Sequence, residues 1–247
     1  MTLIFKTLLA AHLFSDFYIQ IQNNNEKKNY LIKNLFIYPI TFLFICINTF
    51  SKINYISIII FLLIHLLIKI IIKFLHTEYK LSNIPLYLTE QSICILLLLY
   101  YSYRTYPVTI NLFKTWLINL CNKDIFILEQ YISWLLLIIA IIQPASVTIK
   151  ILLTEFQPHT SVKKKNDILI KQGRPNAGAF IGILERILIL LMLSIKEYSS
   201  IGLVITAKSV VRYKKISEDP EFSEYYLLGT LLSTILVILF YLLIIPS

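Results

Sequence analysis

Charged residues are scarce in this chain, and no polar stretch in it is long enough to fold as a separate soluble domain. Charged residues make up 15% of the 247 residues, whereas hydrophobic residues make up 57%. A soluble globular domain carries more charge and less apolar side-chain surface than this composition provides. The composition therefore excludes a soluble protein and predicts a single membrane domain over 1–247.

Cysteine is also rare, and the common catalytic motifs are missing from the sequence. The three cysteines lie singly within or beside apolar segments, and their spacing fits neither a zinc motif nor a disulfide framework. The sequence has no phosphate-binding loop, zincin motif or nucleophile elbow. It also has no basic module with interleaved aromatic residues, so a nucleic-acid partner is not expected.

What the chain does have is a series of apolar stretches of about twenty residues, the length that crosses the ~30 Å core of a bilayer as a helix. They predict an all-α polytopic bundle of seven to eight transmembrane helices, including a short hairpin or half-inserted pair near 177–211. The predicted helices are 2–21, 30–50, 54–75, 84–103, 125–153, 177–195, 199–211 and 225–245, with an interfacial segment at 108–121. The bundle divides into polar-seam helices (1–103), linker helices with a basic cytoplasmic loop (104–176) and glycine-rich close-packed helices (177–247).

Lysine and arginine are unevenly distributed among the loops, and the net charge of the chain is +9. When the 22–33 loop is placed in the cytoplasm, most basic residues near helix ends fall on the cytoplasmic side. The positive-inside rule then puts the N-terminus outside the plasma membrane. One basic set is assigned to anionic lipid or, alternatively, to an anionic ligand or partner: Lys163, Lys164, Lys165, Lys171, Arg174, Lys208 and Arg212.

Ionisable side chains lie inside the first apolar stretch, where lipid contact would be costly. His12, Asp16 and Gln20 follow one another at intervals of four residues, which places them on one face of an α-helix. They form either a polar seam that joins helices by hydrogen bonds or a metal or proton site. His12 and Asp16 are the candidate metal ligands; no cofactor is predicted otherwise.

The stretches over 54–75 and 84–103 carry polar groups at similar intervals. Lys69 lies four residues after His65, and it either reaches the headgroups or pairs with Asp16. Glu90 and Cys94 share one helix face. These patterns predict a polar intramembrane site made of His12, Asp16, Gln20, His65, Glu90 and Gln91.

All five glycines lie after residue 172, which indicates close helix packing in that part of the chain. Gly178 and Gly182 form a G-x-x-x-G motif, and Glu185 lies on the same helix face. Arg186 is predicted to need an acidic partner on another helix, for which the sequence offers Asp16, Glu90, Glu129 and Glu224. The residues predicted to hold this packed part together are Gly178, Gly182, Glu185, Arg186, Glu224, Gly229 and Ser233.

Several of these segments resemble a bacterial family of membrane proteins known as the domain-of-unknown-function 3307 family. The resemblance is most specific over 178–186, 207–212 and 224–233, and it is weaker over 11–20 and around His65 and Gln91. The family pattern has a histidine followed four residues later by aspartate, twice, and an Asp-Gln-x-x-His segment. This chain keeps His12 with Asp16, but it has Lys69, Glu90 and Cys94 at the other positions. The resemblance implies a bacterial inner-membrane protein, and the His/Asp sets of the family look similar to metal-dependent membrane hydrolase sites.

Taken together, the residues favour permeation of an ion or small solute, or a channel-like membrane effector or sensor, over an enzyme. The predicted path is lined by His12, Asp16, His65 and Glu90. A membrane-embedded hydrolase using a divalent metal is the first alternative, and a non-catalytic accessory or scaffold protein is the second. The expected partners are the lipid bilayer, anionic lipids, and either further copies of the chain or a neighbouring membrane or cytosolic protein.

Overall fold

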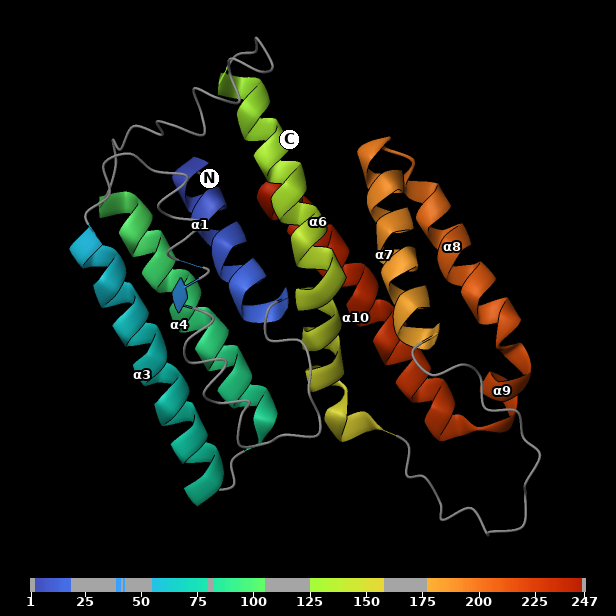
Figure 1. Cartoon of the computed structure of the whole chain (residues 1–247). Helices are drawn as coiled ribbons and strands as arrows, with labels where there is room; N and C mark the ends of the chain where they lie inside the picture. The colour runs from blue at the N-terminus through green and yellow to red at the C-terminus, as the bar shows by residue number, and fades with distance from the viewer. Residues whose placement is uncertain are drawn as a thin grey trace. The chain divides into compact units, whose positions relative to one another are not determined.

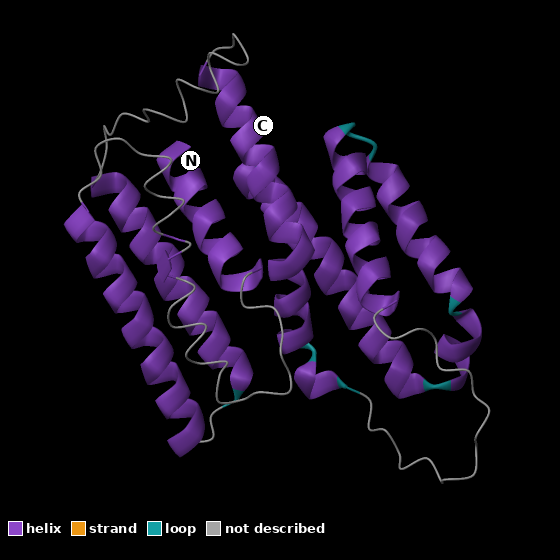
Figure 2. Ribbon diagram, in the orientation of Figure 1, coloured by secondary structure: helices purple, strands orange, loops and turns teal. Residues whose placement is uncertain are grey.

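The computed structural model describes residues 3–18, 39–40, 42, 55–79, 82–104, 125–157 and 177–245. Within these ranges the chain forms eight α-helices and no β-strand (Figures 1 and 2). The elements are α1 (Leu3–Leu13), a π-helical turn η1 (Phe14–Tyr18), α3 (Tyr55–Tyr79), α4 (Asn83–Arg104), α6 (Ile125–Leu152), a 3₁₀ turn η2 (Thr154–Phe156), α7 (Ala177–Ser194), α8 (Tyr198–Val211), α9 (Tyr213–Glu218) and α10 (Pro220–Ile244). The prediction of an all-α bundle is confirmed.

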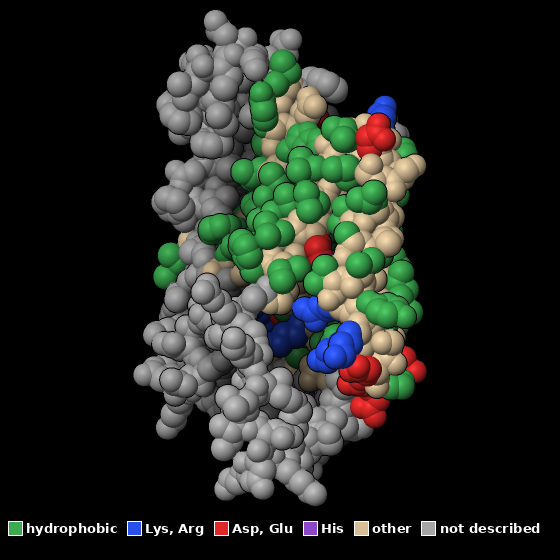
Figure 3. Space-filling view, turned by 90° about the vertical axis from the view of Figure 1, so that its right-hand side faces the viewer, with side chains coloured by type: hydrophobic (Ala, Val, Ile, Leu, Met, Phe, Trp, Pro, Cys, Tyr) green, Lys and Arg blue, Asp and Glu red, His purple; other side chains and the backbone are tan. Residues whose placement is uncertain are grey.

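The helices are long and apolar enough for a membrane protein. Among the described residues, four segments meet the length and composition needed to cross a bilayer, namely Ile59–His76, Ile84–Tyr103, Glu129–Leu152 and Pro220–Ile244. Large apolar side chains on these helices are left uncovered by protein, including Leu63, Leu96 and Leu242. Figure 3 shows one face on which hydrophobic side chains predominate. Such a surface suits lipid rather than water, and the chain is a multi-pass membrane protein.

The chain divides into two compact units, Met1–Ile139 and Ala140–Ser247. Helix α6 contributes its residues up to Ile139 to the first unit and its remaining residues to the second. In the first unit, α1 and α3 both pack against α4. Their shared core contains Phe5, Phe61 and Leu98, each at most 6% exposed.

The first helix departs from the predicted continuous α-helix over 2–21. It changes at Phe14 into the π-helical turn η1, which contains Asp16. A π turn adds a residue to the helical repeat and is frequent at functional sites. His12 and Asp16 therefore lie on either side of this change rather than along one uniform α-helical face, and Gln20 lies outside the described residues.

The last helix begins at Pro220, five residues before the predicted start at 225. The Asp219 side chain accepts a hydrogen bond from the backbone N–H of Phe222 at 3.0 Å. Pro220 follows at the first helical position, where a missing N–H costs nothing. The short helix α9 was not predicted, and the predicted segments 30–50 and 108–121 lie almost wholly outside the described residues.

In the second unit α7 packs against α8 and α10, but the glycines contribute to this packing unequally. A Cβ added at Gly229 would lie 3.2 Å from Leu153 Cδ1, so α10 closely approaches the residue that joins α6 to η2. A Cβ at Gly178 would meet no described atom within 4 Å, and one at Gly182 would meet only the Arg186 side chain. The predicted helix contact at the G-x-x-x-G motif is therefore not made by the described residues.

Candidate functional site

The first unit gathers ionisable side chains from η1, α3 and α4 around Asp16. Asp16 is only 7% exposed, and the π turn projects its carboxylate between the neighbouring helices. Lys69 of α3 donates a hydrogen bond and forms an ion pair with Asp16 Oδ1. Gln91 of α4 donates from Nε2 to Asp16 Oδ2 at 3.3 Å. Both carboxylate oxygens are therefore bound by side chains of other helices.

Two buried histidines lie beside this carboxylate. His12 and His65 are each fully buried, and their ring centroids are 5.6 Å apart in an edge-to-face arrangement. His65 also stacks on Phe61 with centroids 6.3 Å apart. The aromatic contacts fix the plane of the His65 ring, so its nitrogens hold a defined direction toward the cluster.

Three of these side chains could bind one cation together. Asp16, His65 and Glu90 each offer a ligand atom, and these atoms all lie within 4.8 Å of one another. One imidazole nitrogen and two carboxylate oxygens match the donors preferred by divalent cations such as Zn²⁺ and Mn²⁺. The cluster thus has the donor atoms of a metal site. In the structure the positive charge beside Asp16 is that of the Lys69 ammonium.

The charges of the cluster determine what it can do. Lys69 is held by Asp16, but its side chain is 26% exposed, whereas that of Asp16 is 7% exposed. The Lys69 side chain is therefore the more accessible partner of this ion pair. A cation that binds Asp16 and Glu90 would have to displace it, because two cations at one carboxylate repel each other.

The structure places most of the predicted polar site in this one cluster. His12, Asp16, His65, Glu90 and Gln91 come together, and Lys69 adopts the pairing with Asp16 rather than the headgroup position. Cys94, one turn after Glu90, is a fully buried free thiol. The remaining predicted member, Gln20, lies outside the described residues.

A second buried charge in the first unit was missed from the sequence. Lys6 of α1 is only 1% exposed, and its ammonium donates to Glu129 Oε1 at 2.9 Å and to Ser133 Oγ at 2.8 Å. Ser133 in turn donates to the Glu129 carbonyl oxygen at 2.7 Å. Glu129 and Ser133 lie one helical turn apart in α6, and this polar pair was the available signal for a partner to Lys6.

In the second unit the partner predicted for Arg186 is wrong. Instead of an acid, Arg186 binds α6: its Nε donates to the Ile141 carbonyl at 2.6 Å, and its Nη2 donates to the Ile142 carbonyl at 3.3 Å and to Ser146 Oγ. Each backbone carbonyl oxygen has two lone pairs, so the Ile141 and Ile142 carbonyls can accept from the guanidinium of a neighbouring helix. A buried guanidinium, 4% exposed, is thus satisfied by the backbone.

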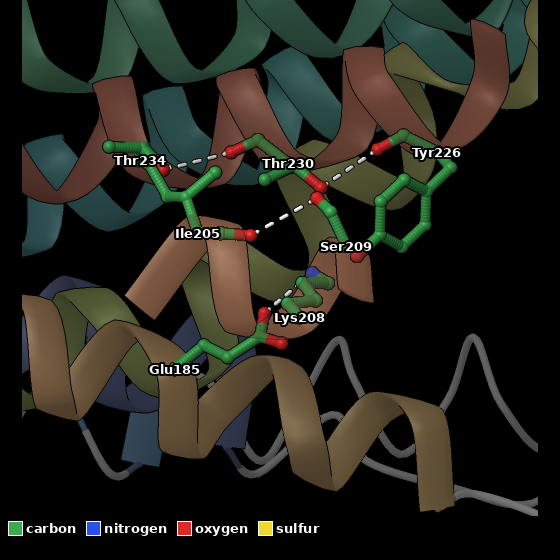
Figure 4. A network of polar contacts seen from close by, with 7 residues as sticks. All are labelled: Glu185, Ile205, Lys208, Ser209, Tyr226, Thr230 and Thr234. Atoms are coloured by element: carbon green, nitrogen blue, oxygen red, sulfur yellow. Dashed lines mark hydrogen bonds and ion pairs between the residues drawn. The ribbon is translucent and has the colours of Figure 1, made fainter. Parts of the chain in front are cut away.

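The neighbouring Glu185 pairs with Lys208 of α8, with Nζ and Oε2 2.6 Å apart (Figure 4). On α10, Thr230 and Thr234 each donate to the carbonyl four residues earlier. Ser233 Oγ is buried and has no hydrogen-bond partner among the described residues. It lines a cavity of about 10 Å³ beside Glu185 and Lys208, room for one water molecule.

Other predicted residues lie elsewhere. Glu224 is exposed on α10, and its predicted packing role stays a prediction. Of the basic set, Lys208 and Arg212 are described, whereas the following lie outside the described residues: Lys163, Lys164, Lys165, Lys171 and Arg174.

Comparisons with protein-family models, with curated proteins and with solved structures found no match to this chain. The resemblance to the domain-of-unknown-function 3307 family therefore stays a prediction. The cluster around Asp16 is the described feature that bears most directly on function.

Proposed function

We propose that this multi-pass membrane protein binds a divalent cation at Asp16, His65 and Glu90 and conducts it across the membrane. The observation that carries the proposal is the convergence of three ligand atoms within 4.8 Å at a carboxylate that also holds Lys69. Ionisable groups inside membrane helices are costly, and they commonly mark ion pathways.

Lys69 gives the site a means of releasing its cargo. While Lys69 holds Asp16, the carboxylate is neutralised and an entering cation meets a positive charge. When a cation binds Asp16 and Glu90, Lys69 withdraws toward its exposed side. Return of the ammonium then lowers the affinity of the site for the bound cation. Binding is thus strong enough for the cation to enter and weak enough for it to leave.

Flux measurements in liposomes test this function. The full chain is reconstituted into vesicles that contain a fluorescent indicator for Zn²⁺ or Mn²⁺, and entry is followed after external addition of the metal. We expect entry above that of empty vesicles, and we expect Asp16→Asn to abolish it. Glu78→Gln makes the same carboxylate-to-amide change at an exposed site of α3 outside the span, so it should retain full flux.

A metal-dependent hydrolase is the second candidate, favoured by the same ligand set. Hydrolysis needs a metal retained with an open coordination position for water, whereas conduction needs a metal that leaves. Elemental analysis of the purified chain separates the two, because a hydrolase retains about one equivalent of metal through gel filtration. Flux without retained metal supports conduction; retained metal without flux supports the hydrolase.

The location that we propose is a bacterial inner membrane with the N-terminus outside and the basic loops in the cytoplasm. The asymmetry of lysine and arginine supports this orientation. We also propose that the chain associates with further copies or with a neighbouring protein. Protease accessibility of an N-terminal epitope tag in intact spheroplasts tests the orientation, since a cytoplasmic tag would be protected.

A further inference from the structure

The turn between α8 and α10 combines basic side chains with an open hollow in the second unit. Helix α8 ends at Val211, the short helix α9 follows, and α10 begins at Pro220. The candidate membrane span of α10 begins at the same residue. Helix α9 therefore lies next to the point where a membrane-crossing helix starts, which is the depth of lipid headgroups.

The hollow at this turn has an excess of positive charge. It measures about 350 Å³ and is lined by Val211, Arg212, Lys214, Lys215 and Glu218. Three basic side chains thus face one carboxylate, an excess of two positive charges. The volume lies in the range of small-molecule sites, and the charge favours an anion.

Aromatic rings of α10 hold the cations in place. Lys215 Nζ lies 3.9 Å from the centroid of the Phe222 ring. The guanidinium carbon of Arg212 lies 5.9 Å from the centroid of the Tyr226 ring. These cation–π contacts order both side chains before any ligand arrives, which lowers the entropy lost on binding.

The surface beside the hollow is apolar. Leu203, Val210, Val211 and Tyr213 are between 67% and 86% exposed along α8 and the start of α9. Figure 3 shows basic side chains, with acidic side chains beside them, toward one end of a face that is otherwise largely hydrophobic. A ligand that fits both regions has an anionic head and an apolar tail.

We propose that this hollow binds the phosphate of an anionic phospholipid, with Arg212 and Lys215 as its principal contacts and the acyl chains along α8. The site lies in the second unit and is distinct from the cation site around Asp16. A soluble phosphate compound would match the basic residues, but it would leave the adjoining apolar surface uncovered. The lipid uses both.

Native mass spectrometry of the full chain in detergent tests the proposal. Adducts are titrated with phosphatidylglycerol and with phosphatidylcholine of the same acyl chains. We expect phosphatidylglycerol to bind more tightly, and we expect the Arg212→Gln, Lys215→Gln double variant to bind it about 25-fold more weakly, about 5-fold for each charge removed. The control is Lys150→Gln with Lys196→Gln, which removes the same charge from two exposed positions and should leave the affinity unchanged.

Three results would overturn the proposal. Equal binding of the two lipids would show that the head charge is not recognised. An equal loss in both double variants would indicate general attraction to a positive protein. Displacement of the lipid by glycerol 3-phosphate at similar concentration would assign the hollow to a soluble anion, because the acyl chains would then contribute nothing.

Discussion

The buried ion pair between Lys6 and Glu129 predicts an unequal response to removal of its two partners. Lys6 is 2% exposed in its side chain, whereas the Glu129 side chain is 35% exposed. Glu129 is also the first residue of its candidate membrane span, so its carboxylate lies near water. Glu129→Gln leaves an ammonium in a buried site without a counter-charge, while Lys6→Met leaves a carboxylate that water can reach.

The expected magnitudes follow from this difference in burial. Loss of one partner from a buried pair costs about 3–5 kcal/mol when the remaining charge stays buried, and we expect Glu129→Gln to lower the free energy of unfolding by that amount. We expect Lys6→Met to cost about 1 kcal/mol, because the remaining carboxylate is hydrated. The double variant should also lose about 1 kcal/mol, since no buried charge is left alone.

The fully buried Cys94 thiol provides the assay. Cys46 and Cys121 are replaced by serine, and the rate at which a thiol reagent labels Cys94 is measured across a titration with sodium dodecyl sulfate in mixed micelles. The midpoint and slope give the free energy of unfolding of the first unit. Glu78→Gln, at an exposed position of α3, is the control and should stay within about 0.5 kcal/mol of the parent. A Glu129→Gln variant as stable as this control, or a Lys6→Met variant less stable than Glu129→Gln, would refute the reasoning.

Substitutions at three further places test the second unit by denaturation in sodium dodecyl sulfate followed by circular dichroism, because all three cysteines lie in the first unit. Arg186→Lys should cost about 2–3 kcal/mol, because one ammonium cannot replace the donors that reach Ile141 and Ser146; parent-like stability would show that those contacts contribute little. Gly229→Leu should cost about 1–3 kcal/mol by crowding Leu153, whereas Gly178→Leu should be nearly neutral. A larger loss of stability in Gly178→Leu than in Gly229→Leu would support the predicted packing at the G-x-x-x-G motif. Asp219→Ala should cost about 1 kcal/mol by removing the cap of α10, and Asp219→Asn should recover most of it; equal losses would argue against a capping role.

Much of the fold and of the first site could be predicted because lipid imposes simple rules. Apolar length alone located α3, α4 and α6, and their observed ends lie within a few residues of the predicted ends except at Tyr79. An unpaired charge is unfavourable in lipid, so a partner was expected for Asp16. Lys69 was among the few cations at membrane depth. The sequence left two positions open for Lys69, at the headgroups or paired with Asp16, and the structure shows the pair.

What could not be predicted depended on the backbone. The π turn at Phe14 has no distinct residue signature, so the direction of the Asp16 side chain was not available from four-residue spacing. The partner of Arg186 was missed because a backbone carbonyl oxygen is present at every residue and has no side-chain signal in the sequence. The glycines were misleading for a related reason, because a glycine permits close approach without requiring it. Of the glycines that the structure describes, only Gly229 lies close to a side chain from outside its own helix.

The central claim is that Asp16, His65 and Glu90 share one cation for which Lys69 competes, and isothermal titration of Zn²⁺ into the purified chain tests it most directly. We predict that the parent chain binds one equivalent, that Asp16→Asn abolishes binding, and that Lys69→Met tightens it at least about tenfold by removing a nearby like charge. No binding to the parent and Lys69→Met chains, or unchanged binding to Asp16→Asn, would contradict the account.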